Sequence, residues 1–216
     1  MAKLRESENI WVLGIFLGIL GLLSAFALAL VSATTAPAIQ KAQERETDKA
    51  IGKLGLPKSK PVDCGTFDKV KFRTALKDGD PVGFVAEVSR KGYGGDIRLL
   101  VGFDTAGEIL AVSVLEHKET PGLGAEVCER KFQKTLTQLS NPHTEKLPEN
   151  RVLDQFGGKR ADGATPWRVQ RDGGTFLYKT GATVTSRAVT EAVEAASRAL
   201  EKNRAAILEK AKQEAK

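Results

Sequence analysis

The feature that most constrains this chain is an uncharged segment close to its N-terminus. No Asp, Glu, Lys or Arg occurs from Asn9 to Gln40, and Ile10–Val31 is almost continuously apolar. A helix that crosses a bilayer needs about 20 such residues at roughly 1.5 Å rise per residue. A cleavable signal peptide has a shorter apolar region of about 7–15 residues, and the small-residue triplet Ala27–Ala29 lies inside the run instead of after it. We therefore expect one uncleaved membrane anchor.

The charges beside this segment say little about its orientation in a membrane. Lys3 and Arg5 precede it together with two glutamates, and three basic residues follow it between Lys41 and Lys49. The one-sided excess of basic residues that usually sets orientation is therefore nearly absent. With so short an N-terminal tail, we expect the N-terminus inside and the bulk of the chain outside the cytoplasm, as for a signal anchor.

The charge and the rarer residue types exclude several classes of function. The formal net charge of +6 lies beyond the anchor, because the segment before it is neutral. Aromatic residues make up 6% of the chain and do not interleave with a basic stripe, so we expect no nucleic-acid partner and a weak attraction to anionic membrane lipid. His117 and His143 have no partner at metal-ligand spacing, and Cys64 and Cys128 form no CxxC pair, so we expect no metal site. Spacing leaves a disulfide between the two cysteines open.

Beyond the anchor, the hydrophobic pattern predicts an α+β architecture. We divide the chain into a cytoplasmic tip with the transmembrane anchor (1–35), a stalk or linker (36–60) and one domain (61–216) that ends in a long helix. Within the domain, short β-branched runs alternate with turns, and Glu194 and Arg198 form an i,i+4 pair on the last helix. This mixture predicts an antiparallel sheet flanked by helices. The expected elements are a stalk helix (41–53), strands (82–88, 97–103, 109–115), a helix (125–139), short strands (167–169, 176–178) and a C-terminal helix whose apolar stripe contains Val189, Val193, Ala196, Leu200 and Ile207, with 63–77 left unassigned.

The segment from Thr180 to Val189 places two small and four hydroxyl-bearing residues directly before the C-terminal helical pattern. Such a helix start suits a phosphate, because its first backbone N–H groups are unsatisfied and the helix dipole favours negative charge there. Gly181 lets the backbone approach closely, and Ala182 adds little bulk. The alternative interpretation is an ordinary N-cap made by one of the hydroxyls.

A second loop, Glu119–Gly124, also connects a predicted strand to a predicted helix. It contains a proline followed by two glycines, so it is rigid at one point and permissive at two others. Its glycines match neither the dinucleotide-binding fingerprint nor a P-loop. The loop is either a stiff turn with Thr120 capping locally, or a second source of backbone N–H groups for the ligand of the Thr180 segment.

These loops belong to a set of short motifs that extends over about two-thirds of the chain. The motifs are Gly92–Gly95, Leu99–Gly102, His117–Gly124, Trp167–Gly174, Thr180–Thr183 and Ser186–Val189. Together they closely resemble the family of G subunits of Rnf-type ion-translocating oxidoreductase complexes, which are related to the C subunits of the sodium-translocating NADH:quinone reductase. The single N-terminal anchor agrees with this resemblance.

The resemblance implies a covalently bound FMN. In that family the flavin is attached through its phosphate to the second threonine of a Ser/Thr-Gly-Ala-Thr motif, which here is Thr183. The Glu119–Gly124 loop would pack on the isoalloxazine with its backbone N–H groups near the ring carbonyls, and Gly124 would adopt a torsion that glycine alone adopts cheaply. The other residues implied at the cofactor are Thr180, Gly181, Ala182, Thr185 and Ser186, the last two as phosphate ligands or caps, and Glu119, Thr120, Pro121, Gly122, Leu123 and Gly124.

The resemblance further implies a role in electron transport. The chain would relay electrons inside a complex of several subunits in the inner membrane, with its domain on the periplasmic side. Its partners would be other membrane and peripheral subunits, membrane lipid and a flavin transferase for maturation. The coupling ion, Na⁺ or H⁺, and the immediate electron donor and acceptor stay open.

One position departs from the family pattern. The transferase motif has an Asp three residues before its first Ser/Thr, where this chain has Leu177, and Lys179 adds a positive charge. The complete Thr-Gly-Ala-Thr favours retention of the flavin. Two alternatives remain: a standalone extracytoplasmic FMN reductase, and a structural tether that has lost its flavin.

Overall fold

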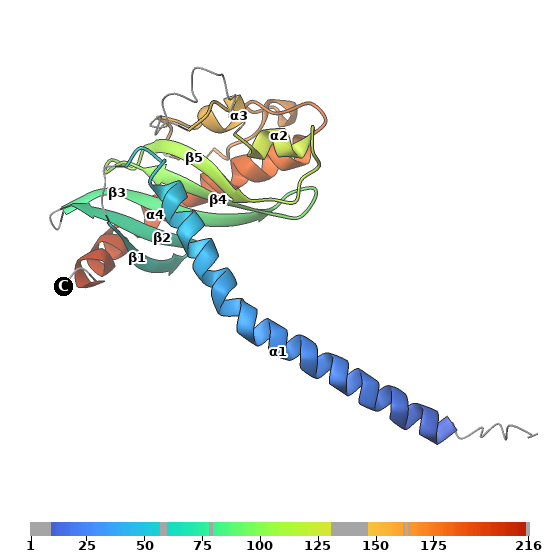
Figure 1. The fold of residues 1–216 in the computed structure, drawn as a ribbon. Helices are drawn as coiled ribbons and strands as arrows, with labels where there is room; N and C mark the ends of the chain where they lie inside the picture. The colour runs from blue at the N-terminus through green and yellow to red at the C-terminus, as the bar shows by residue number, and fades with distance from the viewer. Residues whose placement is uncertain are drawn as a thin grey trace, which may run out of the picture. The chain divides into compact units, whose positions relative to one another are not determined.

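In the computed structural model, the chain forms a long N-terminal helix and an α+β domain (Figure 1). The structure describes residues 10–56, 60–77, 80–130, 147–161, 163 and 165–214. Its elements in chain order are α1 (Ile10–Ile51), β1 (Lys60–Phe67), β2 (Val70–Lys77), β3 (Asp80–Lys91), β4 (Asp96–Phe103), β5 (Ile109–Glu116), α2 (Gly124–Cys128), α3 (Arg151–Asp154), the 3₁₀ helix η2 (Gln170–Asp172) and α4 (Thr183–Glu214).

α1 contains the uncharged segment and is the one described helix that is long and apolar enough to cross a membrane. The large apolar side chains along it, from Trp11 to Ile39, are exposed, as a lipid-facing surface requires. The helix continues through Pro37 into the charged segment that we expected to be helical. Residues up to Glu46 and residues from Thr47 onward form two separate compact units, so the last turn of α1 belongs to the unit that holds the sheet.

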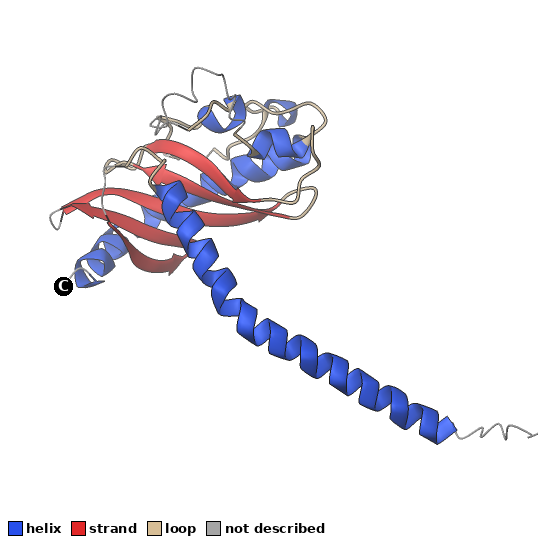
Figure 2. Ribbon diagram, viewed as in Figure 1, coloured by secondary structure: helices blue, strands red, loops and turns tan. Residues whose placement is uncertain are grey.

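The five strands form one antiparallel sheet in chain order, and each strand pairs with the next along the chain (Figure 2). The three predicted strands lie within β3, β4 and β5. The unassigned segment 63–77 contributes most of β1 and all of β2, so the sheet contains two strands that we did not predict. The predicted class, an α+β protein with an antiparallel sheet, is confirmed.

The turn between β1 and β2 explains why that hairpin escaped prediction. It consists of Asp68 and Lys69, which have φ angles of 49° and 67°. Non-glycine residues are uncommon in this left-handed region, and the usual hairpin signal is Asn-Gly or Asp-Gly. The Asp68 carboxylate accepts hydrogen bonds from Lys202 and Asn203 of α4. Tertiary contacts from the C-terminal helix therefore stabilise a turn that the local sequence does not predict.

α4 packs on one face of the sheet, which confirms the predicted amphipathic C-terminal helix. The predicted i,i+4 pair is present, with Arg198 Nη2 lying 2.7 Å from Glu194 Oε1. The opposite face carries a smaller apolar cluster in which Ile51 and Leu54 pack against Val85 and Leu100. The main core consists of Phe72, Phe84, Leu99, Val101 and Phe103 of the sheet with Val189, Val193, Ala196, Leu200 and Ile207 of α4, among others.

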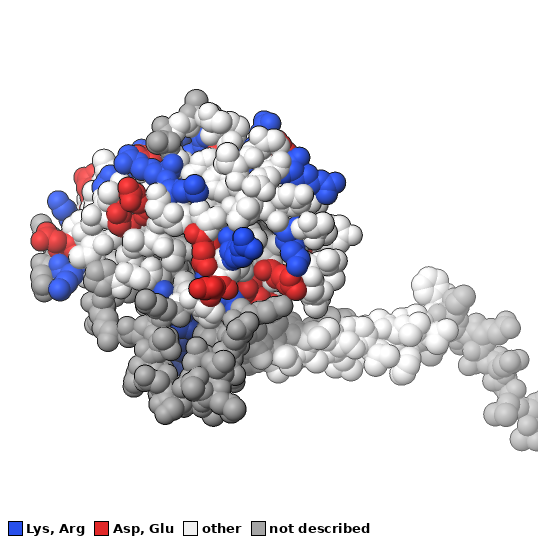
Figure 3. Space-filling view, turned by 90° about the horizontal axis from the view of Figure 1, so that it is seen from above, with Lys and Arg blue, Asp and Glu red and all other residues white. Residues whose placement is uncertain are grey.

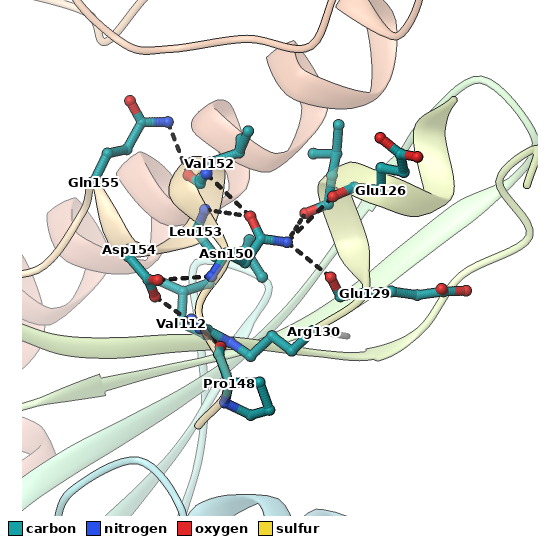
Figure 4. Close-up of polar contacts among 11 residues, drawn as sticks. Val112, Glu126, Glu129, Arg130, Pro148, Asn150, Val152, Leu153, Asp154 and Gln155 are labelled. Atoms are coloured by element: carbon teal, nitrogen blue, oxygen red, sulfur yellow. Dashed lines mark hydrogen bonds and ion pairs between the residues drawn. The ribbon is translucent and has the colours of Figure 1, made fainter. Parts of the chain in front are cut away.

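The helix predicted over 125–139 ends much earlier. α2 stops at Cys128, because Glu129 has extended backbone angles, and residues 131–146 lie outside the described part of the chain. The buried Asn150 side chain terminates α2 by donating to the carbonyl oxygens of Glu126, Val127 and Glu129, at 2.9–3.2 Å (Figure 4). A contact from a residue distant in sequence therefore overrides the helical pattern.

The same Asn150 side chain also begins α3. Its Oδ1 accepts from the backbone N–H groups of Val152 and Leu153, at 3.0 and 3.1 Å. The amide thus caps the end of one helix and the start of the next, and Figure 4 shows it between the two. This double cap fixes the helix that follows the Glu119–Gly124 loop.

The two short strands predicted over 167–169 and 176–178 are reduced to one isolated bridge between Val169 and Phe176, with η2 between them. Three aromatic rings stack beside this segment: Trp167 lies 4.8 Å from Phe176, and Phe156 lies 6.0 and 5.2 Å from these two, measured between ring centroids. Each such contact contributes about 0.5–1.5 kcal/mol. The loop that precedes the Thr180 segment is therefore anchored to the core.

Two further features bear on the sequence-based expectations. Cys64 and Cys128 are buried free thiols, and burial, together with the charges of Glu119 and Glu129, raises the pKa of Cys128 to about 12. On the face of the domain seen in Figure 3, basic and acidic side chains are interspersed. The positive excess is not collected into one patch on this face.

Candidate functional site

A buried carboxylate joins the two loops that the sequence singled out. Glu119 is 6% exposed, and its Oε2 accepts a hydrogen bond of 2.7 Å from the Thr185 hydroxyl, which is 1% exposed. Its Oε1 accepts a 3.1 Å bond from the backbone N–H of Gly94, in the turn between β3 and β4. Buried charge is costly unless it is hydrogen-bonded, and here both oxygens have partners. One side chain thus ties three segments together.

Glycine at position 124 leaves room for this carboxylate. A Cβ atom on Gly124 would lie 2.3 Å from Glu119 Oε2 and 2.8 Å from Thr185 Oγ1. The reason for the glycine differs from the one we expected, because the positive φ of this loop, 79°, occurs at Gly122 and none occurs at Gly124. Gly124 is needed for space, and Gly122 for backbone conformation.

The middle of the Glu119–Gly124 loop is exposed. Thr120, Pro121, Gly122 and Leu123 all lie at the surface, and Leu123 keeps 45% of its area accessible. The Thr120 carbonyl accepts from the N–H groups of Leu123 and Ala125, and the Thr120 side chain makes no described hydrogen bond. The loop therefore offers an apolar side chain to solvent, with its polar anchor buried beneath.

The Thr180 segment forms a turn that leads directly into α4. Gly181 has a φ of 84°, and a Cβ atom there would lie 3.1 Å from Leu123 Cδ2, so the two loops touch at the surface as well as in the interior. The N–H of Ala182 donates to the Lys179 carbonyl oxygen, and Thr183 is the first residue of the helix. Thr180 and Gly181 are exposed, and Ala182 is buried.

The three hydroxyls at the start of α4 have different surroundings. The Thr185 hydroxyl is bonded to Glu119, and the buried Ser186 hydroxyl donates to the Ala182 carbonyl at 2.9 Å and accepts from the Lys179 N–H at 3.2 Å. Both are used within the fold. Thr183 is only partly buried, and its Oγ1 accepts a 3.1 Å bond from Arg171 Nη1 of η2. Of these three hydroxyls, Thr183 is therefore the one in contact with an exposed cationic side chain, that of Arg171.

Arg171 and its neighbour Asp172 were not among the predicted site residues. Asp172 forms a bidentate ion pair with Arg187 of α4, at 2.7 and 2.9 Å. The hydrogen bonds from Arg187 lower the pKa of the Asp172 carboxyl, and the positive charges of Arg187, Arg171 and Arg168 lower it further. The motif Trp167–Gly174 was the available signal, but its spacing to Thr183 could not show which side chain reaches the hydroxyl.

The two residues that depart from the family pattern, Lys179 and Leu177, both contact neighbouring parts of the fold. Lys179, the added positive charge beside the motif, forms an ion pair with Glu126 of α2. The backbone of Leu177, which stands where the resemblance predicts an Asp, is held on both sides by the Gln155 side chain: its N–H donates to Oε1 at 2.6 Å and its carbonyl accepts from Nε2 at 3.2 Å. His117 Nδ1 accepts from the Glu119 N–H, and His143 lies outside the described residues.

Comparison with known proteins identifies the class first. A family of FMN-binding domains matches residues 92–198, a range that contains both loops, the Gly92–Gly95 turn and η2. The site described above therefore lies inside an FMN-binding domain, preceded by a candidate membrane-spanning helix.

Relatives then identify the family. The G subunit of an ion-translocating oxidoreductase complex from Vibrio cholerae serotype O1 is 32% identical over 198 residues, which cover 85% of this chain and 86% of the relative. The chain belongs to this family of G subunits. Proteins of the same name from Shewanella oneidensis and Salmonella typhi are 36% and 41% identical over 135 and 140 residues. The matches span 55% and 59% of those two proteins, little more than half of their length.

One solved structure is similar in part. It is a crystal structure of the C subunit of the Na⁺-translocating NADH-quinone reductase from Parabacteroides distasonis, with a TM-score of 0.40 and 21% identity. The similarity covers 64% of this chain and 62% of that one.

Proposed function

We propose that this chain is a membrane-anchored flavoprotein that transfers electrons through FMN as a subunit of an ion-translocating oxidoreductase complex. Membership of the G subunit family and the FMN-binding domain support the role in electron transport. α1 anchors the chain in the inner membrane, and the domain stands on the periplasmic side. Its partners are the other membrane and peripheral subunits, membrane lipid and a flavin transferase.

Thr183 is the residue to which we assign covalent attachment of FMN through its phosphate. The observation that carries this assignment is the difference between the hydroxyls of one helical turn: Thr185 and Ser186 are buried and bonded within the fold, while Thr183 is partly exposed beside Arg171. A phosphodiester at the first residue of α4 keeps its negative charge where backbone N–H groups and the helix dipole favour it.

Attachment requires an activated flavin nucleotide, and a flavin dinucleotide supplies one. The Thr183 Oγ1–P bond forms at the phosphorus that carries the flavin, and the bond between that phosphorus and the bridging oxygen of the pyrophosphate breaks, so that the bridging oxygen leaves with the other nucleotide. That nucleotide leaves as a monophosphate, and the hydroxyl proton goes to a base of the transferase. No electron is transferred in this step, so the flavin is attached in the oxidation state of the donor.

The surface around Thr183 fits a flavin as well as a phosphate. Leu123 and Val184 are 45% and 44% exposed, and they flank the exposed Gly181 and the attachment residue. Apolar side chains exposed beside a cationic group suit a planar ring that ends in a charged tail. When bound, the flavin supplies one- and two-electron chemistry. The chain contributes the position of the phosphate and an apolar contact for the ring.

The residue that carries the flavin can be identified from a single tryptic peptide. Trypsin cleavage after Lys179 and Arg187 releases Thr180–Arg187, which contains every candidate hydroxyl. With the full chain produced beside its transferase, we expect flavin fluorescence that survives a denaturing gel, and fragmentation of this peptide should place the phosphoflavin mass on Thr183. Mass on Thr185 or Ser186, or a chain that loses its flavin on denaturation, would contradict the assignment.

A further inference from the structure

Arg171 lies where a ligand of the cofactor phosphate would be needed. Its Nη1 donates to Thr183 Oγ1 at 3.1 Å, and the residue is exposed. Guanidinium groups present a rigid planar fork of donors that matches phosphate oxygens. A single contact to Thr183 uses one of these donors and leaves the others available beside the hydroxyl.

The position of Arg171 is fixed by the residue after it. Asp172 binds Arg187 through two hydrogen bonds, and Arg187 lies one helical turn after Thr183 on the same side of α4. Consecutive residues of η2 thus contact successive turns of the helix. This two-point contact sets the register between η2 and the start of α4.

The backbone of this segment is also well ordered by hydrogen bonds. The N–H groups of Asp172 and Gly174 both donate to the Val169 carbonyl, and Gln170 N–H donates to the Phe176 carbonyl. Trp167 and Phe176 stack on each other at the edge of the main core. Arg171 therefore projects from a segment that the protein's own hydrogen bonds and ring contacts hold in place, which reduces the entropy lost on binding.

The local charges leave Arg171 available for an anion. Three arginines, Arg168, Arg171 and Arg187, lie near one carboxylate, and that carboxylate is paired with Arg187. Among the residues that the structure describes, none forms an ion pair with Arg171. The cluster carries excess positive charge beside the hydroxyl that we assign to attachment.

We propose that Arg171 binds the phosphoryl group during and after its transfer to Thr183, and that the Asp172–Arg187 pair holds it in place. This inference rests on the proposed attachment of FMN to Thr183. Before transfer, the guanidinium donates to Oγ1 and orients the hydroxyl. As the Oγ1–P bond forms, its remaining N–H donors meet the non-bridging oxygens of the phosphate, where negative charge develops.

The test compares two arginine variants of the full chain in detergent. Arg171→Gln removes the donor fork, and Arg168→Gln removes the same charge from a neighbouring position that makes no described contact with Thr183. With purified transferase and a flavin dinucleotide, the initial rate of covalent flavin incorporation should fall at least about tenfold in Arg171→Gln. It should stay within about twofold in Arg168→Gln, because charge alone acts weakly at an exposed site. Arg171→Lys should give an intermediate rate, because it keeps the charge and loses the fork.

A second readout separates binding from folding. Thermal unfolding of the flavin-free Arg171→Gln chain should stay within about 2 °C of the unaltered chain, because the lost contact is exposed. In chains loaded to completion, the ³¹P resonance of the phosphodiester should shift in Arg171→Gln and not in Arg168→Gln. Equal incorporation rates in the two variants and the unaltered chain, or equal losses in both variants, would overturn the role of Arg171.

Thr183→Val distinguishes this inference from the proposal beneath it. If Thr183→Val takes up no covalent flavin while Arg171→Gln is loaded at the normal rate, attachment stands and the role of Arg171 falls. If Thr183→Val is loaded like the unaltered chain, the attachment site itself is wrong, and the phosphate role of Arg171 falls with it.

Discussion

Thr183 and Thr185 lie two residues apart on the first turn of α4, yet they belong to different parts of the molecule. Thr185 is buried and donates to the buried carboxylate of Glu119, which also holds the Gly94 turn. Thr183 is partly exposed and accepts from an exposed arginine. Thr185 belongs to the buried region that supports the site, which we call the building region. Thr183 belongs to the exposed region that can bind a ligand, which we call the receiving region.

This difference shows that a motif rich in hydroxyls need not be a set of equivalent ligands. Spacing alone makes Thr183, Thr185 and Ser186 alike as candidates for the phosphate, and only the family resemblance distinguishes Thr183 as the attachment residue. The fold separates them by burial, because successive helical residues point about 100° apart. Substitutions in the building region should change stability, and substitutions in the receiving region should change flavin loading.

The largest change in stability should come from Asn150, a buried residue that we include in the building region because it caps α2 and α3. Asn150→Ala removes hydrogen bonds to three carbonyls of the α2 end and two N–H groups of α3, all at a buried position. We expect the free energy of unfolding to fall by about 4 kcal/mol. Denaturant unfolding of the flavin-free full chain on a Trp11→Phe background, followed by Trp167 fluorescence, measures this change.

Glu149→Ala is the matched control for that prediction, because Glu149 is the exposed preceding residue and makes no described hydrogen bond. Its unfolding midpoint should match that of the unaltered chain. A loss below about 1 kcal/mol in Asn150→Ala would mean that the double cap does not hold the building region together.

The next largest loss of stability compares Gly124 with Gly122, two glycines of the same loop. Gly124→Ala places a Cβ atom 2.3 Å from Glu119 Oε2 and must disturb the Glu119–Thr185 bond, so we expect a loss of about 3 kcal/mol. Gly122→Ala meets no atom within 4 Å and suffers only from its φ of 79°, so we expect about 1 kcal/mol. The same unfolding assay measures both. Equal losses, or a larger loss at Gly122, would show that Glu119 is not held by tight packing.

Much of the fold could be predicted because periodicity marks it. The apolar stripe of α4 and the β-branched runs of β3 to β5 depend on local pattern, and both are confirmed. The hairpin at Asp68–Lys69 and the early end of α2 could not be predicted, because each depends on a distant partner. Asn203 supports the first and Asn150 the second.

The site was predictable in its segments and not in its roles. The loops at Glu119 and Thr183 were identified from their motifs, and the structure brings the loops together. Gly122 has the positive φ that we expected at Gly124, and Gly124 provides space for Glu119. These roles depend on atomic positions that a linear pattern does not contain, and so does the contact of Arg171 with Thr183. Burial separates Thr183 from Thr185, and burial follows from the completed fold.

The most direct test of this division measures two quantities in Thr183→Val and Thr185→Val side by side. Thr183→Val should keep the unfolding midpoint of the unaltered chain and carry no covalent flavin after coexpression with the transferase. Thr185→Val should unfold about 2 kcal/mol more easily, because it leaves a buried carboxylate oxygen without its donor, while its folded fraction still carries covalent flavin. The opposite pattern, with flavin lost in Thr185→Val and kept in Thr183→Val, would contradict the account.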